Sequence, residues 1–94
     1  MLALFVTIKV KPGQELSFEE VAKELVDKVN ANEPGCALYQ LSRSQTEHTY
    51  HFMERYVDEA ALAAHRTTSY FKEIGARMGA HMEGRPVVLA LTEV

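Results

Sequence analysis

The sequence predicts a single α+β domain that covers residues 1–94 and contains an antiparallel sheet. Two observations lead to this prediction. Segments with alternating or continuous apolar residues occur at both ends of the chain and in its middle. Segments with the apolar spacing of amphipathic helices lie between them. A chain of this length has room for one modest hydrophobic core.

The first ten residues predict a strand that ends at the turn sequence Lys-Pro-Gly of residues 11–13. One face of this strand is wholly apolar and must be covered by other elements. It carries Leu2, Leu4, Val6, Ile8 and Val10. The opposite face is mixed, although Phe5 there also requires cover.

A helix is predicted next, because Ser17 and Glu20 have the spacing of a capping box. Charged residues, Glu19 among them, occupy one face of this helix. The other face carries a single apolar stripe, formed by Phe18, Val21, Ala22, Leu25, Val26 and Val29. The helix ends at Asn30 to Asn32, and the Glu-Pro-Gly sequence of residues 33–35 predicts a tight turn.

Three more strands are predicted in the rest of the chain. They cover Cys36–Ser44, Thr49–Val57 and Val87–Glu93, and residues 45–48 form a hairpin loop between the first two.

Two helices separate the last two of these strands. Asp58 is predicted to cap the first, over Glu59–Arg66. Thr68 or Ser69 is predicted to cap the second, which runs from Tyr70 to about Met82. The resulting order β-α-β-β-α-α-β is that of a ferredoxin-like fold, in which the helices cover one side of the sheet.

Composition and charge restrict the partners of this domain. The net charge is -3 and no basic patch is present, so the sequence predicts no nucleic-acid partner. The single cysteine, Cys36, allows no internal disulfide, and no Cys/His spacing indicates a metal site. No stretch approaches the roughly 20 apolar residues that span a bilayer, and the first residues lack the pattern of a secretory signal. We therefore expect no membrane partner and a cytoplasmic location.

The second face of the sheet would face water in a monomer, yet the sequence predicts apolar residues there. Depending on the register of the strands, this face carries some of Phe5, Tyr39, Leu41, Phe52 and Tyr56. Because 47% of the residues in this small domain are hydrophobic, association is one way to bury such a surface. We expect a homodimer that packs through its sheet faces. A slightly apolar monomer is the alternative.

His65 is the histidine whose position favours a functional role. Ala61 and Leu62 precede it by one helical turn, so it projects from the apolar side of its predicted helix. Taken alone, such a histidine is more often a core residue that hydrogen-bonds a carboxylate or a carbonyl.

Glu54 is the second candidate, since it lies between Phe52 and Tyr56 on one face of a predicted strand. A carboxylate is costly there unless it is paired or solvated. One explanation is a structural ion pair with one of three arginines, Arg43, Arg55 or Arg66. The other is a pocket containing Glu54, His65 and Tyr56, in which the carboxylate orients the imidazole for proton transfer.

Several short segments also have the order and spacing seen in a known family. They are residues 33–36 (Glu-Pro-Gly-Cys), residues 52–56 (Phe-Met-Glu-Arg-Tyr), residues 58–65 (Asp-Glu-Ala-Ala-Leu-Ala-Ala-His), Thr68 and Phe71. Together they resemble the antibiotic biosynthesis monooxygenase family, and the resemblance covers essentially the whole chain. It implies a dimeric α+β barrel, in which two ferredoxin-like subunits pack through their sheets.

The resemblance implies less about the chemistry, because one fold serves several reactions. Members of the family oxidise quinols or phenols without a cofactor, degrade haem, or act on a phosphorylated sugar. The haem-degrading branch uses a tryptophan that this chain lacks, and Thr7 stands where that branch has an asparagine. Tyr70 stands where the family often has a histidine. The resemblance therefore does not favour haem degradation.

Our hypothesis is a cofactor-independent monooxygenase that oxidises a small quinol or phenol with molecular oxygen. His65, held by Glu54, would remove a phenolic proton. The expected substrate contacts are Phe52, Tyr56, Phe71, Tyr70, Tyr39 and Thr7, and no metal or other cofactor is expected. Two alternatives stay open: a non-catalytic dimer that binds a small ligand or a protein, and an isomerase or lyase acting on a small polar metabolite. A pocket rich in arginine would favour the isomerase or lyase, and an aromatic pocket the monooxygenase.

Overall fold

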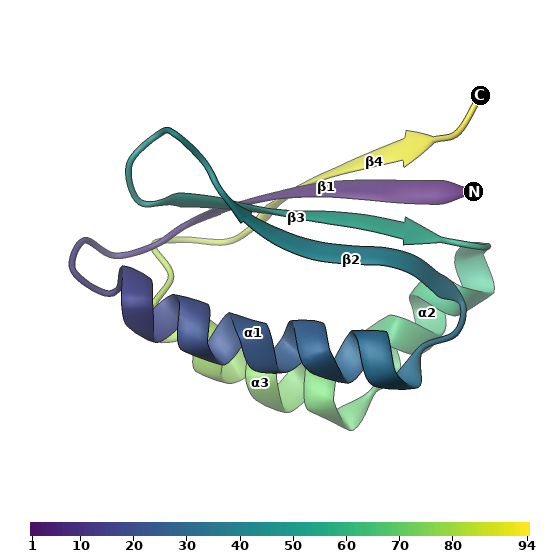
Figure 1. Cartoon of the computed structure of the whole chain (residues 1–94), viewed down its shortest axis with the longest axis horizontal. Helices are drawn as coiled ribbons and strands as arrows, with labels where there is room; N and C mark the ends of the chain where they lie inside the picture. Colours follow the sequence, from purple (N-terminus) through teal and green to yellow (C-terminus); the bar gives the residue numbers. More distant parts are fainter.

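The computed structural model describes residues 1–94 and confirms the predicted order of elements. These elements are β1 (Leu2–Lys9), α1 (Glu15–Asn32), β2 (Cys36–Arg43), β3 (Thr49–Tyr56), α2 (Glu59–Thr67), α3 (Ser69–Gly79) and β4 (Val87–Thr92). The four strands form one antiparallel sheet in the order β2-β3-β1-β4. All three helices lie on the same side of this sheet (Figure 1). None of them is long and apolar enough to cross a membrane.

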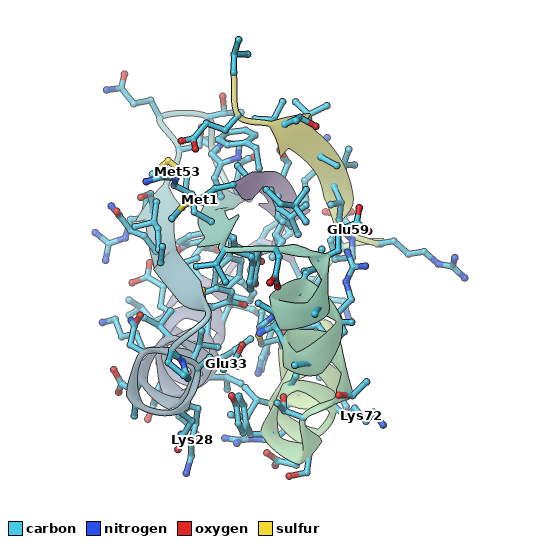
Figure 2. The ribbon with its side chains drawn as sticks, turned by 90° about the vertical axis from the view of Figure 1, so that its right-hand side faces the viewer. Met1, Lys28, Glu33, Met53, Glu59 and Lys72 are labelled. Atoms are coloured by element: carbon cyan, nitrogen blue, oxygen red, sulfur yellow. The ribbon has the colours of Figure 1, made fainter.

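The hydrophobic core lies between the sheet and the helices, which form two layers when viewed along the elements (Figure 2). The predicted apolar face of β1 is buried there, as is the stripe of α1 that includes Phe18, Leu25 and Val29. Ile74 and Met78 contribute the buried stripe of α3. Burial of these side chains is the main source of stability, at about 1.5–3 kcal/mol for each large aliphatic or aromatic residue.

The register of the strands corrects the prediction for the second face of the sheet. Val6 pairs with Phe52 and Leu2 with Tyr56, so both aromatic residues point into the helix-covered core. Tyr39 and Leu41 pair with Glu54 and Phe52 and therefore lie on the same covered side. Of the five residues proposed for the second face, Phe5 alone lies there.

We call the uncovered side of the sheet the open face. It includes Phe5, Thr7, His51, Met53, Val87, Leu89 and Leu91. The ring of Phe5 stacks on that of His51, with centroids 4.7 Å apart. Every residue of β4 is exposed, so this strand is held by its hydrogen bonds to β1 and lacks cover on either side.

The starts and ends of the helices differ from the prediction in two places. The predicted capping box is wrong: α1 begins at Glu15, and Gln14 caps it without a side-chain hydrogen bond. The Glu15 carboxylate accepts a hydrogen bond from the N–H of Gly13, whose φ of +87° turns the chain into the helix earlier than Ser17. Helix α3 ends at Gly79, and Met82 instead pairs with Val10 in an isolated bridge.

The predicted caps of the other two helices are present. Asp58 accepts a hydrogen bond from the N–H of Ala61 at 2.8 Å, and Thr68 accepts one from the N–H of Phe71 at 3.2 Å. Thr68, and not Ser69, is therefore the cap of α3.

Glu19 is buried although the sequence places it on the charged face of α1. Arg43 donates two hydrogen bonds of 2.7 Å to its carboxylate, and the Tyr50 hydroxyl donates a third. These bonds hold the pKa of Glu19 at about 2. The contact ties α1 to the β2–β3 edge of the sheet.

Gly35 brings the turn after α1 against α2. A Cβ atom at this position would lie 2.7 Å from the Cβ of Ala61, well inside van der Waals contact. The Gly35 carbonyl also accepts a hydrogen bond of 2.9 Å from the N–H of Val57. The absence of a side chain therefore allows residues 33–36 to approach α2 closely.

We expect Gly35→Ala to lower the free energy of unfolding by about 1–3 kcal/mol, because the added methyl group must displace α2 or the turn. Gly75→Ala is the matched control: a Cβ there meets no atom within 4 Å and lies inside α3. That change should be neutral or stabilise the protein by up to about 1 kcal/mol. Urea unfolding of both variants measures the difference, and equal stability of Gly35→Ala and the parent would contradict the close contact.

Candidate functional site

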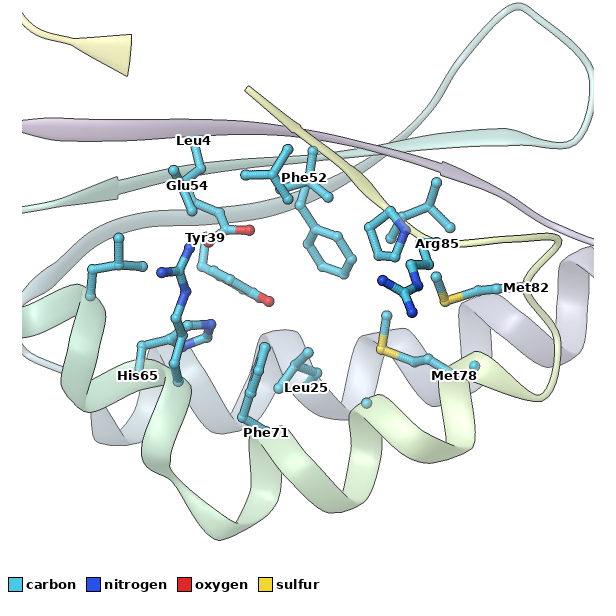
Figure 3. A pocket seen from close by; sticks show the side chains of 18 of the residues that line it. Leu4, Leu25, Tyr39, Phe52, Glu54, His65, Phe71, Met78, Met82 and Arg85 are labelled. Carbon is cyan, nitrogen blue, oxygen red and sulfur yellow. The ribbon is translucent and has the colours of Figure 1, made fainter. Parts of the chain in front are cut away.

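A cavity of about 410 Å³ lies between the sheet and helices α2 and α3. Eleven of the 19 residues that line it are hydrophobic, and few polar groups reach it. In Figure 3, Tyr39, Phe52 and Glu54 point into it from the sheet, whereas His65 and Phe71 face them from the helices. An apolar cavity of this size with a few convergent polar groups is typical of a small-molecule site.

Five of the eight predicted site residues therefore lie on the wall of one cavity: Glu54, His65, Tyr39, Phe52 and Phe71. They come from four consecutive elements, β2, β3, α2 and α3, two in the sheet and two in the helix layer. Strand alternation aims the three sheet residues at the helices, and the apolar side of each helix faces back.

The structure does not support the predicted pairing of His65 with Glu54. The Nδ1 atom of His65 lies 2.9 Å from Oε1 and 3.1 Å from Oε2 of Glu33. Glu33 directly follows α1 and is labelled in Figure 2. Because a carboxylate accepts hydrogen bonds, the Nδ1 atom of His65 carries the proton. The carboxylate that orients the imidazole therefore comes from the turn after α1 and not from β3.

The other ring nitrogen of His65 is available to a ligand. His65 is buried, at 2% exposure, and its Nε2 atom forms no hydrogen bond within the chain. No buried side-chain nitrogen or oxygen lacks a partner, so Nε2 must reach open space, and the space beside His65 is the cavity. In the neutral imidazole with its proton on Nδ1, Nε2 is the acceptor atom, and it is directed toward the cavity.

Aromatic rings hold the imidazole in this orientation. The ring centroid of His65 lies 4.7 Å from that of Phe71, 5.2 Å from that of Tyr39 and 5.5 Å from that of Tyr56. All three contacts are tilted, as is typical of packed aromatic pairs. Rotation of the imidazole away from the cavity would lose these contacts and the bond to Glu33.

Tyr70 does not line the cavity as predicted. Its hydroxyl donates a hydrogen bond to the carboxylate of Glu33, on the far side of His65 from the cavity. Burial and the neighbouring carboxylate raise the pKa of Tyr70 to about 12, so the hydroxyl keeps its proton and remains a donor. Tyr70 therefore supports Glu33, which in turn orients His65.

Glu54 is buried, and burial raises the pKa of its carboxyl group. The Tyr56 hydroxyl donates a hydrogen bond of 2.6 Å to it, and the nearby positive charge of Arg66 opposes the rise. None of the three arginines proposed as ion-pair partners lies within salt-bridge distance of Glu54: Arg43 binds Glu19, Arg55 binds Glu93, and Arg66 has no salt bridge.

Tyr56 and Thr7 also differ from their predicted roles. Tyr56 is fully buried behind the cavity wall, where it holds Glu54, and burial next to that carboxylate raises the pKa of its hydroxyl. Thr7 lies on the open face, and its hydroxyl is 3.2 Å from Nδ1 of His51. Neither residue lines the cavity.

Three polar residues of the site were not predicted: Glu33 as the partner of His65, and Arg66 and Arg85 as residues of the cavity wall. The Glu-Pro-Gly-Cys segment was a signal for Glu33, but a turn sequence does not show where its side chain points. Arg66 was detectable as the neighbour of His65. Arg85 lies in a loop between Gly84 and Pro86, which sequence patterns treat only as a break.

Cys36 and the possible metal ligands add no reactive group. The thiol of Cys36 donates a hydrogen bond to the Leu38 carbonyl, and burial raises its pKa, which disfavours the reactive thiolate. No three His, Cys, Asp or Glu side chains cluster in a way that could hold a metal ion. The titratable groups of His65 and Glu54 on the cavity wall can perform proton transfer.

Comparisons with known proteins agree with the fold and identify the family. The sequence model of the family described as "Antibiotic biosynthesis monooxygenase" matches residues 1–77. A curated relative from Bacillus subtilis (strain 168), named "Putative monooxygenase YcnE", is 34% identical over 95 residues, which cover 100% of this chain and 98% of that protein.

Solved structures share the fold over nearly the whole chain. One from Caulobacter crescentus CB15, described as a "putative antibiotic biosynthesis monooxygenase", is 46% identical with a TM-score of 0.95, covering 99% of this chain and 89% of that chain. PA3566 from Pseudomonas aeruginosa is 26% identical with a TM-score of 0.88, covering 99% and 93%.

The raised pKa of Glu54 predicts that its charge destabilises the fold. Because this carboxyl group binds its proton more tightly in the folded state than in the unfolded state, the protein loses stability as the pH rises above the ordinary pKa of a glutamate. We expect Glu54→Gln, which can still accept the bond from Tyr56, to increase the free energy of unfolding by about 0.5–2 kcal/mol at pH 7.5. At pH 4 the gain should be absent, and urea unfolding at the two pH values measures both.

Glu24→Gln is the control for this prediction. Glu24 is paired with Arg77, which lowers its pKa, so its loss should act in the opposite direction and lower stability at pH 7.5. A Glu54→Gln variant that is less stable than the parent at pH 7.5 would contradict the argument.

Proposed function

The chain belongs to the antibiotic biosynthesis monooxygenase family, and from this premise we propose that it oxidises a small quinol or phenol with molecular oxygen, without a metal or organic cofactor. One observation carries the proposal. The imidazole of His65, held through Nδ1 by the half-buried Glu33 carboxylate, lies on the wall of a largely aromatic and aliphatic cavity. Such a group can remove a proton from a bound phenol.

His65 would act first, as a general base. Its Nε2 atom takes the proton of the phenolic hydroxyl, and the resulting imidazolium keeps its second proton on Nδ1 against Glu33. The Glu33 carboxylate stabilises this positive charge, and the bond from Tyr70 keeps the carboxylate in place. An aromatic wall of Tyr39, Phe52 and Phe71 would hold the substrate ring.

The oxidation itself needs no further reductant, because the substrate supplies the electrons. The phenolate passes one electron to oxygen, and the radical pair then joins to form a bond between a ring carbon and oxygen. After protonation of the resulting peroxide by His65, the O–O bond breaks and the hydrogen of the same ring carbon leaves as a proton. The balance is one phenol and one O₂ giving one quinone and one water.

Glu54 has a raised pKa and faces the same cavity, so in its protonated form it can donate a hydrogen bond to an oxygen of the substrate. This role differs from the one predicted from the sequence, in which Glu54 orients His65. In the proposed mechanism His65 is the base and Glu33 orients it, whereas Glu54 is the hydrogen-bond donor and Tyr56 holds it in place.

A second candidate function is an isomerase or lyase acting on a small polar metabolite. The observation that favours it is the presence of two arginines, Arg66 and Arg85, on the cavity wall. The same base could then move a proton next to a carbonyl group. The predominance of hydrophobic residues in the wall favours the oxidation of an aromatic substrate instead.

The open face supports a further part of the proposal, a homodimer packed through the sheets. Val87, Leu89 and Leu91 are 68%, 55% and 46% exposed, and they lie beside Phe5 and Met53. A contiguous apolar strip of this kind is typical of an interaction surface. A second copy is the occupant that we propose, since its own strip has the same apolar character.

His65→Ala should reduce the rate of oxygen uptake with an active hydroquinone by about 10²–10⁴-fold, because the base is lost. His81→Ala is the control: His81 bonds Gln14 and does not line the cavity, so its loss should leave the rate unchanged. The rates are measured with an oxygen electrode in metal-free buffer over a panel of hydroquinones and phenols. A folded His65→Ala variant with the parent rate would remove His65 from the mechanism.

Oxygen uptake with no member of the panel would count against oxidation. In that case isotope exchange of substrate protons with solvent, catalysed by the parent and lost in His65→Ala, would support the isomerase or lyase. Binding without either reaction would support a non-catalytic ligand-binding domain.

The homodimer is tested by sedimentation equilibrium at micromolar concentration. We expect the mass of two chains for the parent protein and the mass of one chain for Leu89→Lys, which places a charge in the centre of the apolar strip. Leu16→Lys is the control, because Leu16 is 78% exposed on α1, away from the sheet. A monomeric parent protein would refute the dimer.

A further inference from the structure

The five arginines of the chain fall into two groups. Arg43, Arg55 and Arg77 each form a salt bridge of 2.6–2.7 Å with a glutamate outside the cavity wall. Arg66 and Arg85 form no salt bridge and no side-chain hydrogen bond within the chain, and both line the cavity. The guanidinium groups that lack a partner are thus the two that border the candidate site.

The two arginines lie toward different ends of the cavity. Arg66 directly follows His65, and its charge acts on the carboxyl group of Glu54. Arg85 precedes Pro86 in the loop between α3 and β4. In Figure 3 it extends toward the cavity beside Met78 and Met82, at the end away from His65 and Glu54.

The two ends of the cavity therefore differ in the charged groups that surround them. At the His65 end, the carboxyl groups of Glu33 and Glu54 are already present together with one arginine. At the other end Arg85 is the charged residue of the wall, and the side chains near it are apolar. An anionic group would therefore be disfavoured beside the Glu33 carboxylate at the first end and attracted by Arg85 at the second.

We propose that the cavity binds a hydroxyaromatic carboxylic acid, with its carboxylate on Arg85 and its hydroxyl group toward His65. A guanidinium group matches a carboxylate geometrically and forms two parallel hydrogen bonds with it. The ring lies across the apolar middle of the cavity, against Phe52 and Phe71. The direction of the hydroxyl group rests on the proposed function of His65, whereas the carboxylate contact is an independent matter of binding.

The test compares two probes that differ only in charge: 6-hydroxy-2-naphthoic acid and its carboxamide. Their binding is measured by calorimetry without oxygen, so that no turnover occurs. We expect the parent protein to bind the acid about 10- to 100-fold more tightly than the amide, as charge-assisted hydrogen bonds typically provide. Added salt should weaken binding of the acid and leave that of the amide unchanged.

Arg85→Gln should remove the preference for the acid and leave the affinity for the amide unchanged. Lys72→Gln is the matched control. It also removes one positive charge, but from a residue of α3 that does not line the cavity. It should keep the preference. Thermal unfolding verifies that both variants fold.

Three results would overturn the inference: equal affinity of the parent for acid and amide, no binding of the acid at millimolar concentration, or equal loss in Lys72→Gln and Arg85→Gln. The proposed oxidation is judged separately. Binding of the acid through Arg85 without oxygen uptake would keep this inference and refute the oxidation. Oxidation of a neutral hydroquinone by the parent protein, together with equal affinity of the parent protein for the acid and the amide, would support the oxidation and refute this inference.

Discussion

The alternation of side chains along β3 is the constraint on which the site depends. Phe52, Glu54 and Tyr56 occupy three successive inward positions, so a carboxyl group lies in an otherwise apolar row. A shift of one residue would expose Glu54 but would also expose both aromatic rings. The aromatic burial outweighs the cost of one carboxyl group, and the register is kept. Tyr56 of the same strand then provides a hydrogen bond to Glu54, and the cavity under the sheet provides open space beside it.

The helix layer meets this requirement with a second polar group that faces the first. His65 from α2, Glu33 from the turn after α1, and Tyr70 from α3 form one chain of hydrogen bonds. Each of the three comes from a different element, so the packing of the helices against one another sets the orientation of the imidazole. All buried polar side-chain atoms are satisfied, which means that the network costs little in unpaired groups.

Sequence patterns were sufficient for the order of the elements and for five of the 19 residues of the cavity wall. Alternation predicted β1 and β3, the stripe of Phe18, Leu25 and Val29 predicted α1, and the two polar residues found in apolar surroundings, Glu54 and His65, do border one cavity. The partner of His65 was missed for a physical reason. Glu33 and His65 are 32 residues apart, and the turn that carries Glu33 lies against α2 through the tertiary approach of Gly35 to Ala61, which no local pattern reports.

The dependence on contacts that local patterns do not report also explains the errors at Ser17 and on the open face. Helix starts depend on which turn precedes them, and the positive φ of Gly13 lets α1 begin before the Ser17 signal. The faces of β2 and β3 could not be assigned without the register, which is fixed by the pairing of Leu4 with Glu54 and of Glu54 with Tyr39.

The position of Glu33 at the carboxyl end of α1 has a consequence for the electrostatics of the whole helix. The peptide dipoles of an 18-residue helix sum to a partial negative charge at this end, where an acidic side chain is disfavoured by about 0.3–1 kcal/mol. The last turn of α1 has no basic residue to offset it. A carboxylate is therefore present where helix stability alone would select glycine or a cation. The macrodipole adds its negative potential to that of Glu33 at the point where Glu33 binds Nδ1 of His65.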